Sequence, residues 1–279
     1  MEGVPRWSRW LLPALALLAR TLALLAMTVA TVATTVVPLD MARDSFDDQY
    51  RGCRQAMALA VPALCKFEYQ KNPLFAQTWA KADAEWRTRG SPVSPLPSPW
   101  QAVALLTYTT KDIYKEFNEA VRTAGRSRRE YRDRFHFKAL HFLLSQALAA
   151  LRDTQKNKCH RVSRGVHDVQ FQARAGQRVR FGHFTSTSLD TTFEVNREVL
   201  IPPFETFKVN QVTQNGAKAW ISPRSAGTYG NYNCEPSHSP RGVPDSPLVP
   251  SGGSIPTAPF YLRGLLLTTP ALAVATGIL

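Results

Sequence analysis

Three short runs in the second half of the sequence supply an arginine, a serine and a glutamate that could act on one substrate. Arg164 lies in the run VSRG, Ser186 in FTSTS, and Glu198 opens EVLIPP. A planar guanidinium binds a diphosphate through paired hydrogen bonds. A carboxylate held in place stabilises an oxocarbenium-like cation, and a nearby hydroxyl fixes its rotamer. These residue types predict cleavage of NAD at its nicotinamide–ribose bond, provided that the three runs meet.

Taken singly, each of these residues also has an ordinary structural explanation. Arg164 could be a surface residue after a strand, Ser186 a polar position in a strand, and Glu198 a charge on an edge strand. Tyr108, in the run LTYT, would normally be a core or interface residue. The chemistry therefore depends on whether the fold brings the arginine, the serine and the glutamate into one cleft.

The hydrophobic pattern predicts helices first and strands later. Apolar residues at three-and-four spacing predict helices over residues 46–66, 74–87, 113–121 and 135–151. Short apolar or alternating runs predict strands over residues 103–108, 178–184, 198–201, 206–212 and 217–221. Pro62 is expected to break or kink the first helix, and the Pro/Ser-rich residues 90–99 are expected to form a surface loop. The order predicts an α+β fold, with a helical N-terminal half packed on a mostly antiparallel β core.

Both ends of the chain carry apolar segments that are typical of processing signals. Residues 1–36 join basic residues to a long apolar run and then small residues, which predicts a secretory signal peptide. A signal anchor is the alternative, because the run is long enough to span a bilayer. Residues 255–279 form a spacer and an apolar tail, which predicts a GPI signal that is removed. Residues 240–254 would be a flexible stalk with the attachment region, and residues 37–239 the folded domain.

The composition favours an extracellular protein with an anionic ligand. The formal net charge of +13 indicates attraction to acidic surfaces, nucleic acid or an anionic ligand, and secretion argues against nucleic acid. The protein is expected on the extracellular face of the plasma membrane, held by a GPI lipid, or secreted.

The four cysteines of a secreted chain predict disulfides. A bond between Cys53 and Cys234 would tie the two ends of the domain together. Cys65 and Cys159 could pair or stay free. The sequence contains no Cys-x-x-Cys and no His-Glu-x-x-His, so no metal site is expected.

Six segments of the sequence resemble one known family, the vertebrate ecto mono-ADP-ribosyltransferases. They are DSFDDQYRGC at 44–53, EFNEAVR at 116–122, FKALHF at 137–142 and then, in order, VSRGVH, FTSTS and EVLIPP. The last three match the arginine, serine and glutamate motifs of the family. The resemblance covers nearly the whole mature chain, and the type that it resembles is GPI-anchored and arginine-specific.

The resemblance implies a fold of the ADP-ribosyltransferase type and an enzyme that moves ADP-ribose from NAD to exposed arginines of proteins. NAD would be the substrate, without a metal. Arg164 would hold NAD, Ser186 would orient the glutamate, and Glu198 would be the catalytic carboxylate. Tyr108 falls where the family has an NAD-contacting strand end. The family's disulfide supports the pairing of Cys53 with Cys234.

The sequence departs from the family pattern at the first residue of the glutamate motif. The family reads Glu-x-Glu, and its first glutamate, which steers the acceptor arginine, is replaced here by Asn196. An amide accepts a hydrogen bond but does not neutralise a guanidinium. NAD glycohydrolysis is therefore an alternative to transfer, and a catalytically inactive surface protein is another. Glu194 is the candidate substitute, although it lies two residues too early.

A second departure is the short distance between the serine and the glutamate. Ser186 and Glu198 are only twelve positions apart in the sequence. The family has a further long segment there, with a strand and the cysteine that would pair with Cys159, so part of the sheet is expected to be missing. A hairpin folded about Thr192 would still set Ser186 directly opposite Glu198, on one face of the sheet.

Overall fold

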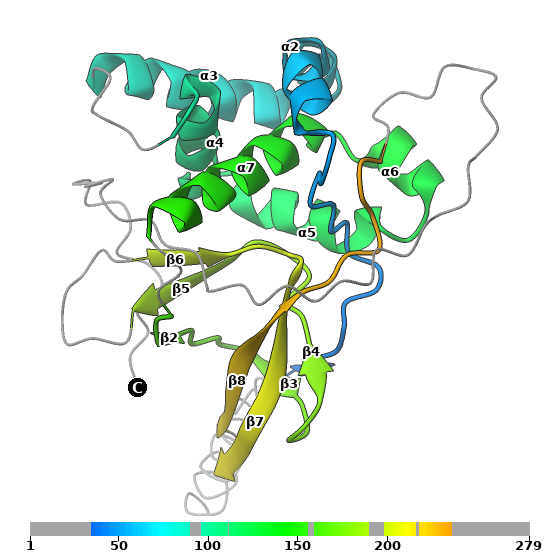
Figure 1. Cartoon of the computed structure of the whole chain (residues 1–279), viewed down its shortest axis with the longest axis vertical. Coiled ribbons are helices and arrows are strands. Elements are labelled where there is room, and N and C mark those ends of the chain that lie inside the picture. The colour runs from blue at the N-terminus through cyan, green and yellow to red at the C-terminus, as the bar shows by residue number, and fades with distance from the viewer. Residues whose placement is uncertain are drawn as a thin grey trace, which may run out of the picture.

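A computed structural model describes residues 35–89, 96–110, 112–155, 159–189, 198–215 and 218–235. The predicted signal peptide lies outside these residues except for Thr35 and Val36, which begin the first strand. The predicted stalk and C-terminal tail, residues 240–279, lie wholly outside them. The described residues form a helical layer above a layer of strands (Figure 1). No helix among them is both long and apolar enough to cross a membrane.

The helical layer is organised around α7 (Lys138–Thr154), which lies between α4 and the strands (Figure 1). Most of its side chains are buried. The carboxylate of Glu68 accepts hydrogen bonds from the backbone N–H groups of Lys138 and Ala139 at 2.6 and 3.0 Å, satisfying two donors that a helix leaves open at its start. The other helices are α2 (Arg54–Lys71), α3 (Pro73–Arg89), α4 (Pro99–Thr109), α5 (Tyr114–Ala124) and α6 (Arg128–Arg134).

The strand expected over residues 103–108 is wrong, because this run is the middle of α4. All its side chains are buried, so the helix is apolar on every side and lacks the period that would distinguish it from a buried strand. The helix-start signals lie just before it. The hydroxyl of Ser98 accepts a hydrogen bond from the backbone N–H of Trp100 at 3.2 Å, and Pro99 occupies the first turn.

The first expected helix is also corrected at its start and in its middle. The helix expected from residue 46 begins at Arg54, because Tyr50 and Gly52 have φ angles of 54° and 87° that a right-handed helix excludes. It then continues through Pro62, where a break or kink is expected, and ends at Lys71. The helices expected over residues 74–87, 113–121 and 135–151 correspond to α3, α5 and α7 and are confirmed.

Within the described residues the strands form three small sheets, which are antiparallel except for one pair. The parallel pair joins β1 (Thr35–Pro38) to β3 (Val169–Gln172). The second sheet has the order β2 (Val162–Ser163), β5 (Thr185–Leu189) and β6 (Glu198–Ile201). The third has the order β4 (Arg178–Val179), β7 (Glu205–Asn215) and β8 (Lys218–Thr228). The predicted α+β class with a mostly antiparallel β core is confirmed.

The strand expected over residues 178–184 is shortened to β4. At Arg180 the chain leaves the ladder, and its backbone N–H donates to the carbonyl oxygen of Asp40 at 2.7 Å. The guanidinium of Arg180 is buried and forms an ion pair with Asp47. The strands expected over residues 198–201 and 206–212 lie within β6 and β7, and the described residues 218–221 of the last expected strand lie within β8.

Two adjacent aspartates hold the last described residues against the core. Asp47 accepts backbone N–H bonds at 2.8 and 3.0 Å, and Asp48 accepts two more at 2.9 and 2.8 Å. The donors are Asn231, Tyr232, Cys234 and Glu235. The disulfide between Cys53 and Cys234 forms at the same place, which confirms the predicted pairing.

Candidate active site

Arg164 follows β2 directly, and its side chain reaches the neighbouring strand. β2 pairs with the far end of β5, where Ser163 lies opposite Ser188. The guanidinium Nη1 of Arg164 donates to the backbone oxygen of Ser186 at 2.6 Å. The arginine side chain is exposed, and a guanidinium has five N–H donors. Donors therefore remain for an anionic ligand beside β5.

Ser186 and Glu198 lie on paired strands and on the same face of their sheet. In the β5–β6 register Ser186 lies opposite Leu200, and Glu198 lies opposite Ser188. The expected direct opposition of Ser186 and Glu198 is therefore wrong by two residues. A shift of two keeps the side chains on one face, so the expected shared face is confirmed. The turn expected at Thr192 lies outside the described residues.

Glu198 is a partly buried carboxyl next to a positive charge. Burial raises its pKa above the usual range, and the charge of Arg164 lowers it in part. Such a carboxyl is less solvated than a surface glutamate, so its charge acts more strongly on a cation beside it. Within the part of the chain that the structure describes, the Ser186 hydroxyl and the Glu198 carboxyl are not hydrogen-bonded to each other. Their shared face is what brings them together.

Tyr108 lies under the serine strand, on a helix and not at the expected strand end. Its hydroxyl donates to the backbone oxygen of Phe184 at 2.7 Å and accepts a hydrogen bond from Nδ2 of Asn118 at 3.1 Å. Only 5% of Tyr108 is exposed. The rings of Phe117 and Phe184 stack with centroids 5.5 Å apart. The side chains of α4 and α5 therefore fix the backbone at the start of the FTSTS run.

The pKa of Tyr108 depends on its burial and on the polar groups around it. Burial raises the pKa of Tyr108 to about 12, and hydrogen bonds with Asn118 and Ser186 lower it in part. The charge of Arg164 also lowers this pKa, while the charge of Glu198 raises it. Arg164, Ser186 and Glu198 thus each affect the pKa of this buried phenol.

His183 is a buried neighbour of the site that the sequence did not single out. Burial lowers its pKa to about 3, and the positive charges of Arg122 and Arg164 lower it as well. Its Nδ1 lies 2.7 Å from the backbone oxygen of Phe181. A neutral histidine beside two cations is suited to holding the strand in place and not to proton transfer near neutral pH. Asn118 lies in the EFNEAVR segment and His183 directly before FTSTS, but only their contacts reveal what each side chain does.

Two predicted features of the site fall outside what the structure describes. Asn196 and the candidate substitute Glu194 both lie in the undescribed residues 190–197. Among the described residues no group of three or more His, Cys, Asp or Glu side chains could hold a metal ion. Cys65 is buried and Cys159 exposed, and both are free.

The chain is similar in sequence to one known protein family. The sequence model described as NAD:arginine ADP-ribosyltransferase matches residues 39–194, which include Arg164 and Ser186. The chain belongs to this family. The erythroblast NAD(P)(+)--arginine ADP-ribosyltransferase of Gallus gallus is 42% identical over 231 residues, covering 71% of this chain and 76% of that protein. The GPI-linked NAD(P)(+)--arginine ADP-ribosyltransferase 1 of Homo sapiens is 41% identical over 245 residues, covering 71% and 74%.

The fold is also similar to solved members of the NAD:arginine ADP-ribosyltransferase family. The eucaryotic mono-ADP-ribosyltransferase ART2.2 superposes with a TM-score of 0.59 at 29% identity, covering 71% of this chain and 98% of that chain. A mutant of ART2.2 in complex with NAD superposes with a TM-score of 0.57.

The relatives contain residues that have no counterpart in this chain. The alignment with the human protein runs over 245 residues, which is more than 71% of a chain of 279 residues. Gaps must therefore be placed in this chain. The absence of a segment between Ser186 and Glu198 in particular remains a prediction. In the structure β5 and β6 are paired antiparallel neighbours.

Proposed function

We propose that this protein is an NAD-dependent mono-ADP-ribosyltransferase that modifies arginine residues of other proteins at the cell surface. The observation that carries the proposal is the meeting of Arg164, Ser186 and Glu198 at one sheet, in a member of the NAD:arginine ADP-ribosyltransferase family. The relatives described above are named as arginine ADP-ribosyltransferases, and ART2.2 has been solved with NAD.

Arg164 is proposed to hold NAD by its diphosphate. One N–H of its guanidinium is used by the backbone of β5, which fixes the side chain. The remaining N–H groups then face solvent in an orientation that is already set, so little side-chain entropy is lost when the diphosphate binds. The high net positive charge of the chain favours the approach of the same anion.

Glu198 is proposed to stabilise the charge that develops when the glycosidic bond breaks. The bond between the ribose carbon and the nicotinamide nitrogen breaks, and its electron pair leaves with nicotinamide. The ribosyl carbon becomes cationic, and a carboxylate beside it lowers the barrier. Ser186, on the same face, is proposed to orient this carboxylate. A guanidinium nitrogen of the acceptor then attacks the ribosyl carbon and loses a proton.

Tyr108 is proposed to support the NAD-binding surface from below. Its hydroxyl is already engaged by Phe184 and Asn118, and its ring is buried. It therefore positions the strand that carries Ser186. Direct contact of Tyr108 with NAD, which the family resemblance implies, remains a prediction.

The protein is proposed to be attached to the extracellular face of the plasma membrane by a GPI lipid. The predicted leader at residues 1–36 and the predicted tail at residues 255–279 support this, and two relatives from mammals are named GPI-linked. In cells that express the full chain, a phospholipase that cleaves GPI anchors should release the protein into the medium. Protein that stays with the cells after this treatment would contradict the anchor.

The function is tested by incubating the folded mature domain with labelled NAD, with and without a small guanidine acceptor. Nicotinamide release and labelled acceptor are measured separately. We expect both in the natural protein. Glu198→Gln should lower both by about a hundredfold or more, as expected when a group that stabilises transition-state charge is lost. Glu119→Gln, an exposed glutamate on α5, is the matched control and should leave both unchanged.

The outcomes separate the candidate functions. Folded protein that releases no nicotinamide and labels no acceptor would show a catalytically inactive surface protein. Nicotinamide release without labelled acceptor would show an NAD glycohydrolase. Full activity in Glu198→Gln would remove Glu198 from the mechanism.

A further inference from the structure

A cavity opens in the helical layer, apart from the proposed NAD site. It has a volume of about 330 Å³ and lies between α2, α4 and α7. None of Arg164, Ser186 and Glu198 lines it. Its size is at the lower end of the range for small-molecule sites. It is therefore a separate candidate for ligand binding.

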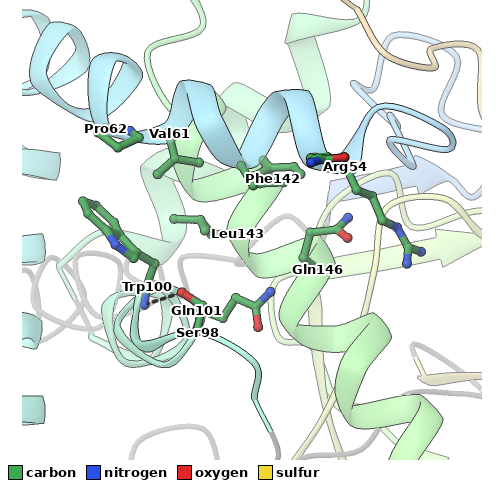
Figure 2. Close-up of a pocket in the computed structure, with 11 residues that line it drawn as sticks. Arg54, Val61, Pro62, Ser98, Trp100, Gln101, Phe142, Leu143 and Gln146 are labelled. Carbon is green, nitrogen blue, oxygen red and sulfur yellow. Dashed lines mark hydrogen bonds between the residues drawn. The ribbon is translucent and has the colours of Figure 1, made fainter.

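One end of this helical cavity carries polar groups that have no partner within the described residues. Gln146, on α7, is 9% exposed, and its side chain makes no hydrogen bond there. The Oε1 atom of Gln101 is buried without a hydrogen-bond partner. The guanidinium of Arg54 forms no ion pair with any described residue. Figure 2 shows Gln146 pointing toward Arg54, with Gln101 beside them. A buried amide oxygen without a partner, such as Oε1 of Gln101, is costly, so a ligand that donates a hydrogen bond to it would be stabilised.

The other end of the helical cavity is apolar. Val61, Leu143 and Trp100 gather there in Figure 2, on α2, α7 and α4. Trp100 is 39% exposed. A ligand that covered it would remove apolar surface from water. The cavity thus has a cationic end, two amides in the middle and an apolar end.

We propose that this cavity binds a small carboxylate joined through an amide to an apolar group, the chemistry of an N-acylated aliphatic amino acid. The carboxylate pairs with the guanidinium of Arg54, as planar groups of opposite charge do. The amide of the ligand bonds to the side chains of Gln101 and Gln146, each of which has a donor and an acceptor. The aliphatic side chain packs against Val61 and Leu143. This ligand satisfies each group that the fold leaves open.

The test is a titration of the isotopically labelled mature domain with N-acetyl-L-leucine, followed by NMR. We expect saturable shifts at the side-chain amides of Gln101 and Gln146. Arg54→Ala should weaken binding by about tenfold, because a hydrogen bond to a charged group is lost. Arg174→Ala, another exposed arginine without a side-chain partner among the described residues, is the matched control and should bind as the natural protein does. The neutral analogue N-acetyl-L-leucinamide should bind as weakly as the acid binds to Arg54→Ala.

A second variant tests the apolar end of the cavity and leaves the charge of Arg54 unchanged. Leu143→Trp fills the apolar end and should abolish the shifts, while nicotinamide release from NAD stays unchanged and reports a folded protein. The proposal is overturned if N-acetyl-L-leucine gives no saturable shifts, or if Arg54→Ala and Arg174→Ala bind equally. Equal binding of the acid and the amide analogue would also overturn it.

Discussion

Whether an amide can replace a carboxylate at position 196 is the central chemical question at the scale of single residues. A carboxylate two residues before Glu198 in the sequence would attract the guanidinium of an acceptor and hold it toward the ribosyl carbon. Asn196 offers only a carbonyl oxygen and no charge. Hydrolysis needs no such group, because water requires no countercharge. The residue type therefore affects the choice of acceptor more than the cleavage of NAD.

Asn196→Glu is expected to raise transfer to a guanidine acceptor by about tenfold relative to hydrolysis, the size expected for a gained charge-assisted hydrogen bond. The ratio of labelled acceptor to released nicotinamide measures it. Asn210→Glu, an exposed position on β7, is the control that adds the same charge elsewhere. An unchanged ratio in Asn196→Glu would show that position 196 does not face the acceptor.

Arg164→Lys tests whether the planar guanidinium or only the positive charge at this position matters. Lysine keeps the charge but loses the paired geometry toward a diphosphate and the fixed bond to the backbone of Ser186. We expect the KM for NAD to rise about tenfold or more, with a smaller effect on kcat, because binding of the diphosphate is the main loss. Steady-state kinetics of nicotinamide release give both constants. A fall in kcat alone would assign the arginine to the chemical step.

At the scale of elements, the sequence predicted the strand that carries Glu198 better than the helix that packs against the serine strand. The strand that begins at Glu198 was predicted from a short apolar run that ends at two prolines, and the helices α3, α5 and α7 were predicted from apolar residues at three-and-four spacing. α4 was missed because it is buried on all sides and has no period. The expected register of β5 and β6 was wrong by two residues, and the sequence DTTF at the expected turn contains no Gly or Asn that would fix the register.

The contact of Tyr108 with the serine strand is a tertiary feature that no local pattern reveals. Tyr108→Phe keeps the ring and removes the hydroxyl, which leaves the buried carbonyl of Phe184 and the amide of Asn118 without their partner. We expect the free energy of unfolding to fall by about 1–3 kcal/mol. Urea denaturation measures this loss. Tyr114→Phe, on an exposed tyrosine of α5, should change it little.

If Tyr108 positions the serine strand, Tyr108→Phe should also lower kcat for nicotinamide release while the KM for NAD changes less. A purely structural role would lower stability and leave kcat of the folded fraction unchanged. A rise in KM that exceeds the fall in kcat would instead support the direct contact with NAD that the family resemblance implies.

At the scale of the whole molecule, the ends of the described chain are joined by a covalent bond and by aspartate carboxylates. The disulfide spans 181 residues. The double variant Cys53→Ser with Cys234→Ser is expected to lower the free energy of unfolding by about 2–5 kcal/mol. Denaturation in urea without reductant measures it, with Cys159→Ser at the exposed free cysteine as control. Equal midpoints for the double variant and the natural protein would show that the hydrogen bonds to Asp47 and Asp48 suffice.

The stability of the whole fold should also depend on pH through one buried carboxyl, Glu205, at the start of β7. Glu205 is 1% exposed, and Ser225 donates a hydrogen bond to its Oε1 atom. Its Oε2 atom has no hydrogen-bond partner among the described residues. Burial raises its pKa to about 8, although the bond from Ser225 and the charge of Arg152 oppose the shift. Near neutral pH the folded state therefore keeps a proton that the unfolded chain has released.

The sign of the effect follows from this difference in bound protons. The pKa of Glu205 rises from 4.5 to about 8 on folding, so its contribution is fully present below pH 4.5 and is lost as the pH rises toward 8. The slope is at most about 1.4 kcal/mol per pH unit. Glu205→Gln mimics the protonated form, so this variant should match the natural protein at low pH and become relatively more stable as the pH rises. Urea denaturation across this range, with Glu119→Gln as an exposed control, measures the difference. Parallel pH profiles of the free energy of unfolding for Glu205→Gln and the natural protein would show that Glu205 is ionised in the folded state. Its unpaired Oε2 atom would then have to be in contact with water.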